Sequence, residues 1–215
     1  MTTTTDKALT TAKRLTAAEA RAAAKMQPLS ENALLSHLAS LGDQPQLRTL
    51  SAAMIAAGLA AGRRSGYGPR LARTGLRMLI AHELATAAKN FVKYRIDRTR
   101  PRSAQKPGKD ALPTPGGNRD KEETSFPSGH AAGSSAVARA FAREYGAHKG
   151  VAAGVGGVLA LVQLPRCAHY PTDVAAGLAI GLLAEGALAA LWPAPPSSAS
   201  ASVTTPEETL PCATS

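Results

Sequence analysis

Aromatic residues are scarce in this chain. Phe, Tyr and Trp together make up only 4% of its 215 residues. A β-sandwich needs β-branched and aromatic side chains on its strands, so this composition disfavours one. Alanine supplies much of the 44% hydrophobic content, and small side chains let helices pack closely. The sequence therefore predicts an all-α protein.

Cysteines and metal-ligand clusters are also sparse. Cys167 and Cys212 are the two cysteines. Two cysteines at this separation provide neither a disulfide framework nor the spacing of metal ligands. No His, Cys and Asp residues recur at the spacing of a metal site. The first thirty residues lack the apolar core of a secretory signal peptide. We expect no metal and no other cofactor.

Positive charge, in contrast, is abundant. The chain carries 25 Lys and Arg against 15 Asp and Glu, a net charge of +10. Such a balance attracts nucleic acid, acidic lipid headgroups or phosphorylated substrates. The few aromatic residues offer little for stacking on bases, which argues against nucleic acid as a partner. Within the N-terminal helical stretch, four basic residues share one helical face, which is either a solvated face or one that lies on an anionic membrane. They are Lys7, Arg14, Arg21 and Lys25.

Composition divides the chain into three parts. Residues 1–45 form a polar, partly helical region, residues 46–193 a helical domain, and residues 194–215 a polar tail typical of disorder. A loop over 102–124, rich in Pro, Gly and charge, is typical of a mobile segment. The domain contains apolar segments at 47–62, 71–92, 130–145, 150–164 and 172–192.

The number of membrane spans is open at this point. A spanning helix needs about 20 predominantly apolar residues, and only segment 172–192 comes near this cleanly, so a soluble bundle is an alternative. If the segments alternate across a bilayer, the basic loops around 63–73 and 143–149 lie on the same side of it. This agrees with the excess of Lys and Arg that is typical of cytoplasmic loops. We therefore predict a membrane-embedded bundle of about five to six core helices.

Three polar clusters lie at the ends of apolar segments. They read KYRIDRTRPR at 93–102, SFPSGH at 125–130 and HYPTD at 169–173. In an up-and-down bundle all three meet at one end. Together they contain histidines, an aspartate, cations and two helix starts with free amides. Phosphoryl transfer needs a nucleophile, a proton donor and positive charge around the phosphoryl oxygens. The clusters supply each of these.

These motifs make the sequence similar to the type 2 phosphatidic acid phosphatase superfamily, over about residues 70 to 190. That family has Lys, six residues, Arg-Pro; then Pro-Ser-Gly-His; then Ser-Arg, five residues, His, three residues, Asp. The matching positions here are Lys93, Arg100, Pro101, Pro127, Ser128, Gly129, His130, His169 and Asp173.

The resemblance implies a role for each matched residue. His169 would attack phosphorus to give a phosphohistidine, and Asp173 would orient and charge its imidazole. His130 would protonate the leaving group and later activate water. The phosphoryl oxygens would be held by Lys93, Arg100 and the amides around Ser128 and Gly129.

The third motif departs from the family pattern. Gln163 stands where the family has arginine, and Val162 replaces the serine. Arg166 follows three residues later, on nearly the same face if the helix continues. We predict that Arg166 makes the missing phosphate contact, with Gln163 as the alternative.

The resemblance implies a metal-independent phosphatase that hydrolyses a phosphomonoester or diphosphate of a lipid, of the phosphatidic acid or polyprenyl diphosphate type. We expect an integral protein of a bacterial inner membrane, with its active site on the extracytoplasmic side. Three alternatives stay open. They are a soluble acid phosphatase, a vanadate-binding haloperoxidase relative and a non-catalytic protein that binds lipid phosphates.

Overall fold

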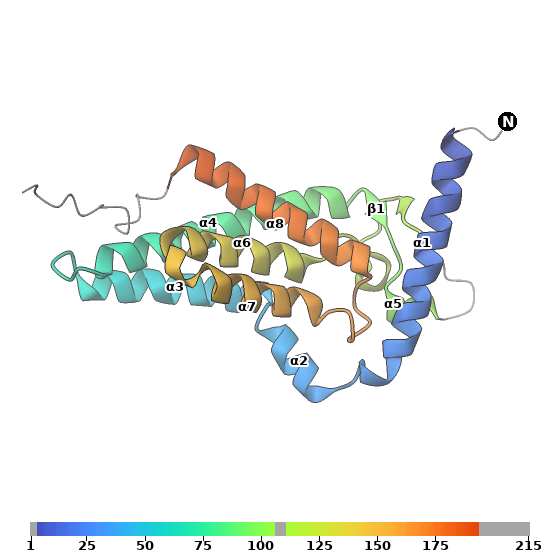
Figure 1. Ribbon diagram of the computed structural model, residues 1–215, viewed down its shortest axis with the longest axis horizontal. Coiled ribbons are helices and arrows are strands. Elements are labelled where there is room, and N and C mark those ends of the chain that lie inside the picture. The colour runs from blue at the N-terminus through green and yellow to red at the C-terminus, as the bar shows by residue number, and fades with distance from the viewer. Residues whose placement is uncertain (1–3, 106–110, 194–215) are drawn as a thin grey trace, which may run out of the picture.

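The computed structural model describes residues 4–105 and 111–193. Within them the regular secondary structure is helical apart from two two-residue strands, which confirms the predicted all-α class (Figure 1). The α-helices are α1 (Thr4–Met26), α2 (Ala33–Ser40), α3 (Gln44–Ala61), α4 (Gly68–Lys93), α5 (Pro101–Ala104), α6 (Gly129–Glu144), α7 (Lys149–Leu161) and α8 (Pro171–Leu191).

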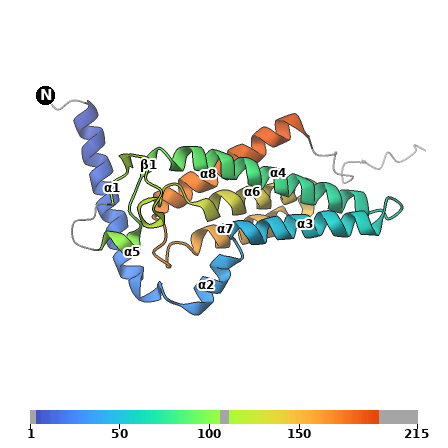
Figure 2. The same cartoon turned by 180° about the vertical axis from the view of Figure 1, so that it is seen from behind.

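Five of these helices form the bundle, and each matches one predicted apolar segment. Helix α6 is central and packs against α4, α7 and α8, while α3 packs along α4. The same pairing is visible from behind in Figure 2. The observed helices begin and end within a few residues of the apolar segments. The reason is that Pro and Gly bound them: Pro45, Pro69 and Pro171 each lie in a first turn.

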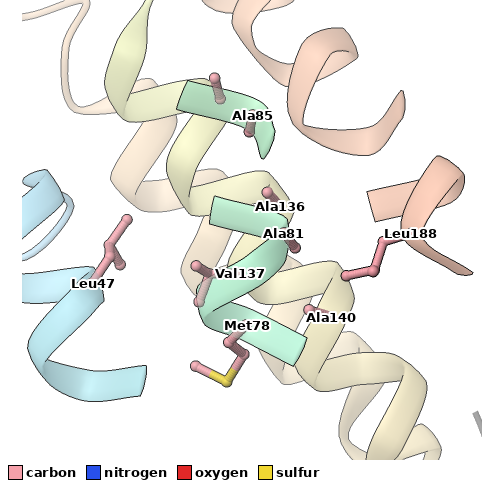
Figure 3. Close-up of a cluster of buried hydrophobic side chains, with 9 residues drawn as sticks. Leu47, Met78, Ala81, Ala85, Ala136, Val137, Ala140 and Leu188 are labelled. Atoms are coloured by element: carbon pink, nitrogen blue, oxygen red, sulfur yellow. The ribbon is translucent and has the colours of Figure 1, made fainter. Parts of the chain in front are cut away.

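The core is made of small side chains. Alanines of α4 and α6, among them Ala81, Ala85, Ala136 and Ala140, lie between Leu47, Met78, Val137 and Leu188 (Figure 3). Glycines bring α8 directly against α6, because a Cβ at Gly177 or Gly181 would overlap the carbonyl oxygen of Ser128 or Ala132. This close approach also fixes the starts of α6 and α8 next to each other, where Ser128 N donates to Asp173 O at 3.0 Å.

Helix direction brings the three clusters together. Helix α4 ends at Lys93 and α7 ends at Leu161, whereas α6 and α8 begin at Gly129 and Pro171. Since consecutive helices of the bundle run in opposite directions, all four termini lie at one end of it. Helix α1 crosses this end beside α5 and strand β1 (Figures 1 and 2).

The described part of the loop over 102–124 is tied to the same end. Strand β1 (Ile96–Asp97) pairs antiparallel with β2 (Thr114–Pro115), and the 3₁₀ helix η2 (Lys121–Glu123) follows. Arg98 N donates to Glu123 O and Arg100 N to Glu122 O, each at 2.8 Å. Two further 3₁₀ turns are η1 (Gln27–Leu29) and η3 (Gly146–His148). Residues 106–110, and the tail 194–215 expected to be disordered, lie outside the described residues.

Among the described helices, α8 is long and apolar enough to cross a membrane, with a mean hydropathy of 2.0. Only 28% of that stretch is buried within the bundle. Leu182 and Leu183 of α8, and Val151, Val155 and Val158 of α7, are exposed apolar side chains. The four basic residues predicted on one face of α1, namely Lys7, Arg14, Arg21 and Lys25, are exposed as well.

Candidate active site

A cavity of about 380 Å³ opens at the end of the bundle where the clusters meet. Both histidines line it, together with Lys93, Arg100 and Gly129. A smaller adjoining cavity of about 180 Å³ shares His130, His169 and Arg100 and adds Gln163 and Arg166. The structure thus brings together all the predicted site residues except Ser128 and Asp173, which lie just behind the wall.

His169 lies in the turn before α8 with 4% of its surface exposed. Its Nδ1 lies 2.8 Å from Ser125 O. A carbonyl oxygen only accepts, so Nδ1 carries the proton and Nε2 has a free lone pair. Burial, assisted by the positive charge of Arg100, lowers the pKa of His169 to about 4 against the opposing effect of Asp173. At neutral pH the imidazole is neutral and able to act as a nucleophile.

Asp173 lies behind His169 rather than in direct hydrogen bond with it. Its Oδ2 is 3.7 Å from His169 Nδ1 and accepts from Tyr170 N at 2.9 Å, which caps α8. Its Oδ1 accepts from Arg98 at 2.5 Å. The group that contacts His169 Nδ1 directly is therefore the Ser125 carbonyl, and not Asp173, for which the orienting role was predicted. A backbone acceptor of this kind gives no signal in the sequence.

His130 is the second residue of α6, and its Nε2 lies 2.8 Å from Asp43 Oδ1. Burial holds the pKa of His130 below its usual range, while the carboxylate of Asp43 acts in the opposite direction. Sequence reasoning missed Asp43. It directly precedes Gln44 and Pro45, the pattern of an ordinary N-cap, yet its side chain makes no capping hydrogen bond to α3.

The cations of the site are held in different ways. Arg100 is fixed by donating from Nε to Lys121 O at 2.7 Å and from Nη1 to Ala168 O at 3.1 Å. Lys93 is not fixed by such side-chain hydrogen bonds among the described residues. Burial, with repulsion from Arg100 and Lys89, lowers its pKa to about 8. Lys121 also lines both cavities. It lies outside the three motifs, and sequence reasoning did not single it out.

Ser128 and Gly129 form the start of α6. Ser128 is its N-cap and accepts from Ala131 N at 3.4 Å. The helix offers no acceptor to the amides of Gly129 and His130, two residues that line the cavity, so these amides are candidate donors for an anion. Lys89 of α4 lies close by, with its Nζ 3.7 Å from the position of a Cβ on Gly129.

The segment around Gln163 and Arg166 corrects one premise of the sequence analysis. Helix α7 ends at Leu161, and residues 162–168 form turns, so the two side chains do not share a helical face. Pro165 cannot donate an N–H to a continued helix. The side chains nevertheless meet, with Arg166 Nη1 donating to Gln163 Oε1 at 3.4 Å. Gln163 is 1% exposed, and its Nε2 has no partner among the described residues.

The assembled groups suit the transfer of an anionic group. A neutral imidazole with a free Nε2, a second imidazole beside a carboxylate, five cations and helical amides surround the two adjoining cavities. Among residues 4–105 and 111–193, no group of three His, Cys, Asp or Glu side chains is placed to hold a metal ion.

Comparison with protein families agrees with this geometry. Residues 74–195, more than half of the chain, match the model of the PAP2 superfamily. The match contains Lys93 through Asp173 but excludes α1 to α3 and hence Asp43. A comparison with curated proteins gives no match.

Proposed function

The chain belongs to the PAP2 superfamily, and on that premise we propose that it is a metal-independent phosphatase acting through a phosphohistidine. Members of the superfamily are phosphatases, so hydrolysis of a phosphoric ester is the activity assigned at superfamily level. The observation that carries the finer proposal is the 2.8 Å contact between His169 Nδ1 and Ser125 O. Because a carbonyl oxygen only accepts, the contact requires the proton on Nδ1 and leaves Nε2 free at the cavity.

The reaction takes two steps. In the first, His169 Nε2 forms a bond to phosphorus while the bond from phosphorus to the leaving oxygen breaks, and His130 gives that oxygen its proton. In the second, His130 takes a proton from water, the resulting hydroxide bonds to phosphorus, and the N–P bond breaks. Phosphate and neutral His169 are released, so protons and electron pairs balance.

The cations stabilise the charge that spreads over the equatorial oxygens. Arg100 is held rigidly by two carbonyl oxygens, and the first amides of α6 are fixed by the helix. Donors that are already oriented cost little reorganisation in the transition state. Lys93, Gln163 and Arg166 are the remaining donors to the phosphoryl oxygens. Arg166 takes the place of the family arginine.

The substrate proposed is a lipid phosphate or diphosphate, and the protein is an integral membrane protein. The exposed apolar side chains of α8, among them Leu182, Leu183 and Leu191, support this. Arg63, Arg64, Arg70 and Arg73 lie near the junction of α3 and α4, at the end of the bundle opposite the site. By the positive-inside rule that end is cytoplasmic and the site extracytoplasmic. A protein that leaves the membrane fraction without detergent would contradict this part of the proposal.

Substitution of the nucleophile tests the mechanism. His169→Ala should abolish turnover of an aryl phosphate and of lipid phosphates while the protein stays folded. Wild type incubated with labelled substrate should yield acid-labile, alkali-stable protein-bound phosphate, which the variant lacks. His148→Ala, an exposed histidine at the opposite end, is the matched control and should behave as wild type. Full activity in His169→Ala would remove the mechanism.

Two reagents test the metal-independent chemistry. Activity should persist in excess chelator, and vanadate should inhibit because its trigonal-bipyramidal form resembles the transferring phosphoryl group. Activity lost in chelator and restored by a divalent ion would require another mechanism. The replacement of the family arginine by Gln163 favours one second candidate, a lipid-phosphate-binding protein without catalysis. Vanadate binding without turnover of any phosphate ester would select it.

A further inference from the structure

Helix α1 reaches the active site through one buried carboxylate. Its docked face consists of Thr16, Glu19 and Ala23, which lie at helical spacing and are buried. Ala23 packs with Ala111 and Tyr170, and these contacts account for the docking of an otherwise solvated helix. Glu19 is different, because it brings a charge with only 5% exposure into the interface. A buried charge is costly unless it is paired.

The partners of Glu19 are residues of the catalytic end. Its Oε1 accepts from Thr172 N at 2.8 Å, one of the first amides of α8. Its Oε2 accepts from Arg98 Nη2 at 2.7 Å and from Thr172 Oγ1 at 3.1 Å. Arg98 in turn donates from Nη1 to Asp173 Oδ1. The guanidinium of Arg98 is therefore held between two carboxylates, one from α1 and one beside His169.

This chain of contacts has an electrostatic consequence. Arg98 alone would neutralise Asp173, the carboxylate 3.7 Å from His169 Nδ1. With Glu19 present, the cluster of Glu19, Arg98 and Asp173 carries one net negative charge. The imidazole of His169 gains positive charge as Nε2 bonds to phosphorus. A buried negative charge stabilises that transition state more than the neutral ground state.

We propose that Glu19 is a positioning residue of the active site, which keeps Asp173 electrostatically available to His169 by sharing Arg98. The inference rests on the proposed function, in which His169 is the nucleophile. It extends the functional unit beyond residues 74–195, the part that the family model matches. Glu19 touches neither substrate nor reacting atoms and acts only through Arg98 and Thr172.

Glu19→Gln in the full chain, purified in detergent, is the main test. The amide keeps the shape but not the charge, so kcat should fall about tenfold while KM stays unchanged, since only transition-state stabilisation is lost. Glu31→Gln makes the same chemical change at an exposed position of the N-terminal region and should match wild type. Equal kcat in the two variants would overturn the proposal, as would a lower melting temperature with unchanged kcat per folded molecule.

A second variant covers the case in which Glu19→Gln does not fold. Glu19→Asp keeps the charge, but its shorter side chain cannot reach both Arg98 and Thr172 N. We expect kcat to fall about threefold at constant KM, less than for the amide. Wild-type kcat in folded Glu19→Asp would contradict a positioning role.

A readout without substrate separates this proposal from the proposed function. Diethyl pyrocarbonate acylates a neutral imidazole nitrogen, and the rate at His169 can be followed by peptide mass spectrometry. Loss of the Glu19 charge should slow acylation of His169 severalfold but leave His148 unaffected. If wild type turns over no phosphate ester, the proposed function fails, and the acylation rates still decide whether Glu19 acts on His169. Equal rates in wild type and Glu19→Gln would refute that action.

Discussion

The two ends of the helical bundle use the same kinds of charged residue in opposite ways. At the end away from the cavity, arginines are paired with two buried carboxylates. Glu185 of α8 accepts from Arg77 at 3.0 Å and from Arg139 and Arg143 at 3.1 and 2.6 Å, and Glu144 accepts from Arg73 at 3.0 Å. We call these six residues the distal ionic cluster.

At the cavity end the balance is reversed. Lys93 and Lys121 make no contact with a carboxylate among the described residues, and Gln163 Nε2 has no partner there either. Lys93 is half-buried and Gln163 is buried, and an unpaired donor in such a position is costly unless an anion satisfies it. The comparison teaches that the number of buried cations does not identify a site. The absence of partners for cations and polar groups identifies a site, because it distinguishes an anion site from a structural ion cluster.

The largest expected effect is a loss of stability when the distal ionic cluster is disrupted. Glu185→Gln leaves three arginines without their shared carboxylate, one of them fully buried. Loss of one member of a buried pair costs roughly 3–5 kcal/mol in the free energy of unfolding. Thermal unfolding should show the loss, while kcat per folded molecule stays within about twofold of wild type.

The exposed pair of Arg48 and Glu83 is the control for that substitution. Its ends are 45% exposed, so Arg48→Gln should leave the melting temperature nearly unchanged. A Glu185→Gln protein that is as stable as Arg48→Gln would mean that the distal ionic cluster contributes nothing to the fold.

The next effect sharpens the contrast within the cavity itself. Arg166→Ala should lower turnover roughly 10²–10³-fold, the loss of one preorganised transition-state donor. Arg102 also lines the smaller cavity but is paired with Glu122. Arg102→Ala should therefore change turnover less than about tenfold, equivalent to roughly 1.4 kcal/mol in the barrier.

A second-site change checks the assignment of Arg166. Arginine introduced by Gln163→Arg into Arg166→Ala should recover part of the activity, because the two side chains are hydrogen-bonded neighbours in the cavity wall. An effect of Arg166→Ala below tenfold, in a folded protein, would remove Arg166 from the site and leave Gln163 as the contact.

Lys93 differs from the arginines of the site because it loses its proton within the pH range of an activity measurement. Both His130 and Lys93 must be protonated for the first step, so kcat/KM falls as pH rises. Because the pKa of Lys93 is about 8, a second proton is lost above that pH, and the falling limb should steepen to about a hundredfold per pH unit. His169, with a pKa of about 4, stays neutral throughout this range.

Lys93→Arg is the matched variant for this titration. A guanidinium stays protonated to far higher pH, so the limb should keep a slope of about tenfold per unit above pH 8. A wild-type limb that never steepens would exclude Lys93 from the titrating groups of the free enzyme.

The fold was predictable because its signals are local. Runs of Ala, Gly and Leu bounded by Pro or Gly located the five bundle helices, and alternation of their directions was enough to place the three motifs at one end. The end of α7 was missed because Pro165 acts on the helix before it. The division at residue 45 and the tail 194–215 stay predictions.

The candidate site was predictable only in part. The motif residues lie within a few positions of helix ends, so their spacing is visible in the chain. Glu19 and Asp43 lie far from every motif and reach the site through tertiary packing alone. Ser125 acts through its backbone carbonyl, which any residue could supply. Local pattern therefore predicted the groups proposed to react and Asp173 beside one of them. It missed Asp43 and the Ser125 carbonyl, which contact these groups, and Glu19, which reaches Asp173 through Arg98.

The smallest effect concerns Asp43, a carboxylate that lines the cavity beside His130. Burial lowers the pKa of that imidazole most, the charge of Asp43 raises it, and the charges of Arg166 and Arg100 lower it further. Asp43→Asn removes the only raising charge among them, so the pKa of His130 should fall. A lower pKa reduces the protonated fraction of His130 at neutral pH. Because His130 must hold a proton for the leaving group, the falling limb of kcat/KM moves to lower pH.

Turnover of Asp43→Asn at pH 7 should decrease by less than about tenfold and recover as the pH is lowered, whereas a purely structural defect would lower activity equally at every pH. Asp97→Asn, at an acidic residue of β1 outside both cavities, provides the control. An unchanged pH profile in folded Asp43→Asn would show that the 2.8 Å contact with His130 has no part in holding the catalytic proton.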